Sequence, residues 1–231
     1  MGNASAKSLT LNDVEKLEKE SLYLSAISPQ VSSSGQVVSG NKNWPTSMTG
    51  ANDKFLEIRK YELKDGRMFT ENEINSLAKV CIVGKTVSDT IFGKGADPVG
   101  QTIRFANIPF KIIGLLKEKG QNSMGQDQDN MILAPYSTVQ RRILAITHIQ
   151  TIVASAVSEE KSSQAIAEIR TILRKQHKLM DGDDDDFTVR SQAELIQTLS
   201  SVSDMLTMLL GAIAGISLLV GGIGIMNIMF V

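Results

Sequence analysis

The sequence predicts an α+β fold in which a β-rich subdomain interrupts a mixed subdomain, followed by a helix long enough to cross a membrane. Helical and extended patterns alternate on both sides of the middle third, and that third contains clustered short β-type runs. The segment from Met205 to Val231 has no Asp, Glu, Lys or Arg. With 231 residues, the chain is long enough for one or two domains with a buried core.

Charge and composition exclude several classes of protein. Lys plus Arg number 24 and Asp plus Glu number 25, which gives a net charge of −1. Charged residues make up 21% and hydrophobic residues 42% of the chain, so neither disorder nor a polybasic surface for nucleic acid is expected. Cys81 is the single cysteine and His148 and His177 are the only histidines, too few for a Cys/His zinc site.

The first 74 residues predict mixed helix and strand. Thr10 and Asp13 have the spacing of a capping box, and Leu11, Val14 and Leu17 follow with helical periodicity. A Ser/Gly-rich stretch then separates two extended runs. The expected elements are a helix near 10–20, strands at 22–31 and 36–38, a short helix capped by Asn52, and a polar turn at 64–67.

The middle third predicts strands, and the mixed pattern returns after it. Short β-type runs lie at 80–83, 102–105, 110–116 and 131–133. A strand at 151–157, a helix at 159–179 and a strand at 187–189 then form a β-α-β unit, which could complete a sheet begun by residues 22–60. We therefore divide the chain into 1–74 and 147–204 as the two halves of one subdomain, 75–146 as the insertion, and 205–231 as the apolar helix.

The C-terminal helix is expected to begin before the apolar segment. Ser191 and Glu194 form a second capping box, and neither Gly nor Pro occurs from 192 to 210. Leu199 continues an apolar face into the uncharged run, where Gly211 and Gly215 have the spacing of a helix contact. About 27 residues make a helix of roughly 40 Å, longer than a hydrocarbon core of about 30 Å. A buried core helix is the alternative.

Three motifs suggest chemistry but fit packing or a solvated turn better. Gly84-Lys85-Thr86 resembles the end of a phosphate-binding loop, yet Lys79 stands where that loop needs a glycine. The acidic run 181–186 lacks the glycine and glutamate of a calcium loop, so a solvated turn is favoured. Cys81 lies inside a predicted strand, which favours a core thiol. We expect no enzymatic activity, no catalytic residues, no cofactor and no metal site.

Longer segments resemble a known family. They are GRMFTENE (66–73), VCIVGKTVSDTIFG (80–93), DPVGQTIRFANIPFKIIGLLKEKG (97–120), DQDNMILAPYSTVQRR (127–142) and LLGAIAGISLLVGGIGIMNIMFV (209–231). In this order they resemble the MacB-type permeases of ABC transporters, over essentially the whole chain. The last segment is similar to the second transmembrane helix of that family and contains Gly221, Gly222 and Gly224. No ATP-binding domain and no first membrane helix are found in these residues.

The resemblance implies a porter-like split α+β subdomain with an inserted sabre-like subdomain, on the periplasmic side of the inner membrane of a Gram-negative bacterium. It implies a second permease copy and an ABC ATPase domain as partners, together with a periplasmic adaptor and a TolC-like outer-membrane channel. The expected function is export of macrolides, peptides or toxins. Lipoprotein-releasing or peptide-sensing permeases, and a ligand-sensing receptor ectodomain, stay open as alternatives. The substrate and the adaptor contact surface stay undetermined.

Overall fold

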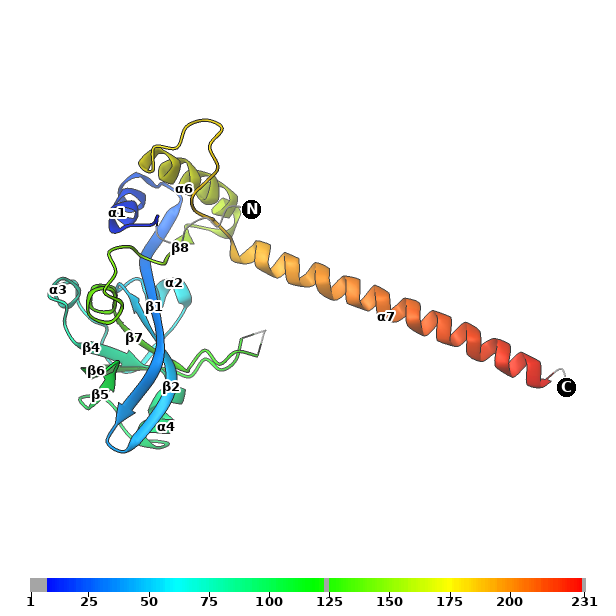
Figure 1. Cartoon of the computed structure of the whole chain (residues 1–231), viewed down its shortest axis with the longest axis horizontal. Coiled ribbons are helices and arrows are strands. Elements are labelled where there is room, and N and C mark those ends of the chain that lie inside the picture. The colour runs from blue at the N-terminus through cyan, green and yellow to red at the C-terminus, as the bar shows by residue number, and fades with distance from the viewer. Residues whose placement is uncertain (1–7, 123–124, 230–231) are drawn as a thin grey trace. The chain divides into compact units, whose positions relative to one another are not determined.

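The computed structural model describes residues 8–122 and 125–229 and confirms the predicted α+β class (Figure 1). In chain order the elements are α1 (Leu11–Glu20), β1 (Leu24–Ser39), β2 (Lys42–Ala51), α2 (Phe55–Arg59), β3 (Leu63–Gly66), α3 (Glu71–Asn75), β4 (Val80–Val83), α4 (Lys85–Phe92), β5 (Thr102–Phe105), β6 (Ile108–Leu116), β7 (Met131–Pro135), α5 (Tyr136–Thr138), the π-helix η1 (Val139–Leu144), β8 (Thr151–Ala156), the 3-10 turn η2 (Glu159–Lys161), α6 (Ser162–Gln176) and α7 (Gln192–Met229). Residues up to Thr188 form one compact unit, and α7 belongs to a second.

Six strands close into a barrel-like ring. Around the ring the order is β1, β2, β7, β4, β6 and β5, and β5 returns to pair with β1. The β2–β7 and β4–β6 pairs are parallel, and the other pairs of the ring are antiparallel. The short strand β3 pairs with β6 outside this path. Closure leaves the ring strands without a free edge, which is how barrels avoid edge-to-edge pairing.

Strand β1 joins the ring to an α/β layer. Residues 24–30 pair antiparallel with β8, and residues 31–39 pair antiparallel with β2. At the crossover, the Gln150 side chain accepts a hydrogen bond from the Ser32 amide at 2.7 Å and donates one to the Ser32 carbonyl at 3.3 Å. Helices α1 and α6 lie side by side at the β8 end of β1 (Figure 1). The predicted sharing of a sheet between residues 22–60 and 151–189 is confirmed by the β1–β8 pairing.

The ring takes strands from two of the segments that the sequence suggested. Strands β4 to β7 come from 75–146, whereas β1 and β2 come from the preceding segment. The subdomain boundaries 1–74, 75–146, 147–204 and 205–231 therefore stay predictions, since strand pairing alone does not divide the compact unit.

Three local predictions are wrong. The runs 22–31 and 36–38 belong to one continuous strand, β1, because the Ser/Gly stretch between them pairs with β2. The polar turn expected at 64–67 is mostly strand β3, paired with β6. Residues 187–189 form no strand; Phe187 is instead buried with its ring edge on His177, at 5.7 Å between ring centroids.

Strand β2 was not predicted at all. Its sequence contains Pro45 and Gly50, two residue types that are depleted in strand interiors. Here Pro45 lies opposite Gln36 on β1. Gly50 faces β1 and the helical segment after β7, where a Cβ atom would lie 2.8 Å from atoms of Val31 and Val139. Close packing of the segment that contains α5 and η1 therefore requires a glycine in this strand.

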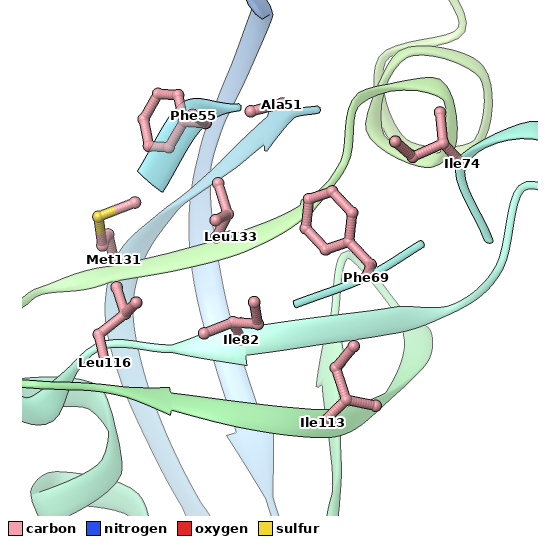
Figure 2. Close-up of a cluster of buried hydrophobic side chains, with 9 residues drawn as sticks. All are labelled: Ala51, Phe55, Phe69, Ile74, Ile82, Ile113, Leu116, Met131 and Leu133. Carbon is pink, nitrogen blue, oxygen red and sulfur yellow. The ribbon is translucent and has the colours of Figure 1, made fainter. Parts of the chain in front are cut away.

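One hydrophobic cluster lies where the ring strands meet the short helices α2 and α3 (Figure 2). Its members come from β2, β4, β6 and β7 and from the segments around these helices, and every one is less than 9% exposed. They are Ala51, Phe55, Phe69, Ile74, Ile82, Ile113, Leu116, Met131 and Leu133. Burial of a large apolar side chain contributes about 1.5–3 kcal/mol, so this cluster ties the inserted strands to the N-terminal segment.

The turn from β4 into α4 shows why Gly84 follows the predicted strand. The Gly84 amide donates to the Met131 carbonyl at 2.9 Å, and a Cβ atom on Gly84 would lie 2.1 Å from the Asp129 carbonyl oxygen. Backbone of the segment before β7 thus occupies the space next to this glycine. Gly84 has a packing role, as the sequence analysis favoured over a phosphate-binding loop.

We predict that Gly84→Ala destabilises the folded unit by about 1–3 kcal/mol, because a methyl group there overlaps a backbone oxygen that cannot move freely. Urea unfolding followed by circular dichroism measures the change. Gly35→Ala is the matched control, since its Cβ atom would lie 3.0 Å from the tip of the Phe105 ring, which can shift. Equal costs for the two substitutions would show that the contact with Asp129 is not what requires glycine.

Candidate functional site

Helix α7 contains or directly follows every residue that the sequence analysis singled out for function. Ser191 precedes its first turn, and the other seven residues, Glu194, Leu199, Gly211, Gly215, Gly221, Gly222 and Gly224, lie within Gln192–Met229. The capping box forms as predicted: the Ser191 amide donates to the Glu194 carboxylate at 3.2 Å, and the Glu194 amide donates to the Ser191 hydroxyl at 3.1 Å. This reciprocal pair fixes where the helix begins.

The helix is suited to an apolar environment along most of its length. Its 38 residues correspond to about 57 Å at 1.5 Å per residue. Among the described residues it is the one helix that passes length and composition criteria for a membrane span, over Gln192–Gly221 with a mean hydropathy of 1.9. The apolar window has no buried share in the structure, and the buried core helix stays the alternative.

Polar side chains in this helix are satisfied by its own backbone. The hydroxyls of Thr198, Ser201 and Thr207 donate to carbonyls four residues earlier, at 2.8 to 2.9 Å. A hydroxyl bonded in this way needs no water partner, so Thr207 can enter a hydrocarbon environment at low cost. Apart from the helix backbone and the adjoining residues, no atom lies within 4 Å of where a Cβ atom would be on Gly211, Gly215 or Gly221. The backbone is therefore uncovered at these three positions of the helix surface.

An acidic strap, residues 180–188, lies in the connection between α6 and α7, and the carboxylates of Asp185 and Asp186 have partners on or next to α6. Asp185 pairs with Arg170 Nε at 2.9 Å and with Arg174 at 2.5 Å. Arg174 also donates to the backbone carbonyls of Asp183 at 2.9 Å and Met180 at 2.6 Å. The solvated turn predicted for 181–186 is confirmed for residues 181–184, which are exposed. It is wrong for Asp185, which is half-buried because two arginines one helical turn apart on α6 bind its carboxylate.

His177 ties the same strap to α1. Its Nδ1 lies 2.7 and 2.9 Å from the two carboxylate oxygens of Asp186, and its Nε2 lies 3.4 Å from Asp13 Oδ2 without forming a hydrogen bond. Asp13 is 2% exposed, and the His177 side chain is 9% exposed. Burial opposes the charged imidazole, but the hydrogen bond to Asp186 and the nearby Asp13 outweigh it and raise the pKa of His177.

Sequence reasoning missed this cluster, although it noted the acidic run. The partners lie on α1, α6 and the strap, and no local spacing connects Asp13 with His177. An acidic run a few residues after a helix that contains arginines was the available signal. Histidine–aspartate pairs also occur in the catalytic triads of hydrolases, where the second ring nitrogen faces a serine hydroxyl. Here the second ring nitrogen of His177 faces Asp13, and the Ser8 hydroxyl donates to the Asp186 carbonyl.

Other candidate chemistry in the described residues reduces to packing. Cys81 is fully buried, and burial raises the pKa of its thiol, so the reactive thiolate is disfavoured. Within residues 8–122 and 125–229 no group of three or more His, Cys, Asp or Glu side chains is arranged to hold a metal. The features that remain are mechanical: a closed ring, an α/β layer with a clasped strap, and a long apolar helix.

Together these features define a class: an α+β domain joined to a candidate membrane helix. The family model described as the MacB-like periplasmic core domain matches residues 1–172. The chain belongs to this family, and it is a periplasmic permease domain of the MacB type.

Individual relatives agree with the family. The macrolide export ATP-binding/permease protein MacB of Syntrophobacter fumaroxidans is 33% identical over all of this chain and 40% of its own length. The protein of the same name from Chlorobium luteolum is 37% identical over the whole chain and 34% of its length. The pyoverdine export ATP-binding/permease protein PvdT of Pseudomonas entomophila is 33% identical over 96% of the chain and 33% of its length. The chain thus spans a third to two fifths of these relatives.

Solved structures show the same fold. The periplasmic region of MacB from Actinobacillus actinomycetemcomitans superposes with a TM-score of 0.70 at 25% identity, covering 84% of each chain. The extracellular domain of the transporter YknZ from Gram-positive bacteria superposes with a TM-score of 0.64 at 20% identity, over 75% of this chain and 86% of that one. The second likeness concerns the fold alone.

We predict that the folded unit loses stability as pH rises above about 6.5, the ordinary His pKa. The raised pKa of His177 means that the folded state binds a proton more tightly than the unfolded state. The stabilisation is complete below the unfolded pKa and is lost as pH rises through the folded pKa. Urea unfolding between pH 5.5 and 9 measures it. His177→Gln should flatten this slope and His148→Gln should keep it; an unchanged slope in His177→Gln would contradict the assignment.

Proposed function

We propose that this chain is the periplasmic part and the second membrane helix of an ABC exporter permease, in which ATP hydrolysis in the cytoplasm drives conformational change in the periplasmic domain. The observation that carries the proposal is the continuity of α7, which runs without a break from polar Gln192 into an uncharged segment that reaches Met229. Intrahelical hydrogen bonds make such a helix stiff, so displacement at one end reaches the other.

A second permease copy fits the surface of α7. Leu199, Val202, Leu206 and Leu209 follow each other at spacings of three and four residues, and all are exposed in this single chain. Leu199 and Val202 lie in a part of the helix that also contains Ser200, Ser201 and Asp204. Lipid alone would therefore not cover this row of apolar side chains. Apolar residues at this spacing favour packing against another helix. This supports a dimer as the working form.

The remaining partners and the location follow from the family. We propose an ABC ATPase domain, a periplasmic adaptor and a TolC-like outer-membrane channel as partners, with the permease in the inner membrane of a Gram-negative bacterium. No nucleic acid partner is proposed. The names of the relatives give macrolide and pyoverdine export for those proteins. For this chain we propose cargo of the same broad class, namely macrolides, peptides or toxins.

We predict that Leu199→Pro in the full-length permease abolishes export while ATP hydrolysis continues. Proline removes a backbone donor and clashes with the preceding turn, which costs about 3 kcal/mol in a helix interior and introduces a flexible joint. Export of a known substrate and ATPase activity are measured in the same membranes, with correct insertion checked by protease protection.

Leu199→Ala is the control, because it keeps the helix and removes only the side chain. Export should then stay within a few-fold of the wild-type rate. The proposal would be contradicted if the correctly inserted Leu199→Pro permease exported at the wild-type rate, since the helix would then not transmit the motion.

A further inference from the structure

The acidic strap is the covalent route from the folded unit to α7. Residues 177–179 separate α6 from Met180, where the strap begins, and only residues 189–191 separate its last residue from the first residue of α7. Backbone hydrogen bonds within the strap are few, since it contains no helix or strand. A segment of this kind would be a loose linker unless side chains held it.

Two arginine side chains of α6 hold the middle of the strap. Arg174 is the central one, because its guanidinium reaches the Asp185 carboxylate and the carbonyls of Met180 and Asp183 at once. Arg170 binds the other oxygen of Asp185. The side chains of Arg174 and Asp185 are 24% and 20% exposed, so this pair is shielded from water more than an ordinary surface pair.

A second set of contacts fixes the far end of the strap to α1. His177 bridges Asp186 and Asp13, the Ser8 hydroxyl donates to the Asp186 carbonyl at 3.0 Å, and Phe187 is buried beside His177. The strap is therefore bound to α6 in its middle and to both α1 and α6 at its end. Each carboxylate in these contacts faces a side chain of the folded unit, Asp185 the two arginines and Asp186 the His177 ring.

We propose that Arg174, Arg170 and His177 are positioning residues that clasp the strap to the α1–α6 layer, so that displacement of α7 is passed to the folded unit rather than absorbed by the connection. The inference rests on the proposed function for its role in transport, but the clasp itself does not. Charged hydrogen bonds of this kind form and break reversibly, which allows the segment to stay attached through repeated cycles of motion.

The clasp is tested on the 231-residue chain in detergent micelles, with an endoprotease that cleaves on the N-terminal side of aspartate. Cleavage within 181–186 requires local opening of the strap, and mass spectrometry identifies the sites. Loss of a charged hydrogen-bond donor should make cleavage there about tenfold faster or more in Arg174→Gln. Lys175→Gln is the matched control, because it removes the same charge from the next, exposed residue of α6.

Asp185→Asn provides the same test from the strap side and leaves α6 unchanged, so the answer does not depend on Arg174→Gln folding. Because this substitution removes the cleavage site before residue 185, rates are compared at Asp183, Asp184 and Asp186 in every protein. Faster cleavage in Arg174→Gln and Asp185→Asn, with wild-type cleavage in Lys175→Gln, is the expected result. Equal cleavage of the strap in all four proteins would overturn the clasp.

The role in transport is tested with the same substitutions in the full-length permease. Arg174→Gln is expected to lower export about tenfold while ATPase activity stays near the wild-type rate, and Lys175→Gln is expected to change neither. Wild-type export by a permease whose strap is released would overturn the positioning role. Absence of ATP-dependent export in the wild-type permease would instead contradict the proposed function, and the protease result would still decide on the clasp.

Discussion

Strand β1 is the element on which the rest of the structure depends. Its 16 residues serve two sheets in succession, first with β8 and then with β2 and β5. Because β1 belongs to both parts, the ring and the α/β layer are joined by a continuous strand and not by a flexible loop. The Gln150 side chain reinforces this arrangement, since it supplies Ser32 with a donor and an acceptor just before β8 begins. Under the proposed function, motion that reaches the α1–α6 layer would be passed along a continuous strand.

Features encoded by local spacing were predictable from the sequence. The capping boxes at Thr10 and Ser191 need only residues three positions apart, and the uncharged C-terminal segment needs only a count. The clustered strands of the middle third were also found, because β-branched and aromatic runs between turn residues are a local signal. These features were enough to define the fold class, whereas the family came from the resemblance of longer sequence segments.

Features that depend on distant partners were not predictable in this way. Strand β2 contains Pro45 and Gly50, and it exists because β1 and β7 supply its ladders on both sides. The acidic strap gives the same lesson for the functional site. Its composition indicates solvent exposure, and only the folded structure brings it to Arg174 and His177. Its contacts span up to 178 residues, as between Ser8 and Asp186, which is further than any sequence motif reaches.

The choice of charged rather than apolar contacts at the strap has a physical reason. Apolar side chains in the strap would pack against the α1–α6 layer. Such contacts are not directional, so they would fix the position of the strap less precisely. Ion pairs with fixed geometry resist displacement until the contact breaks, and their oxygen and nitrogen atoms are then solvated by water without exposing hydrophobic surface. Asp185 and Arg174 are partly exposed, so water can reach them on release. Under the proposed function, a periplasmic domain linked in this manner would be pulled repeatedly without partial unfolding of its core.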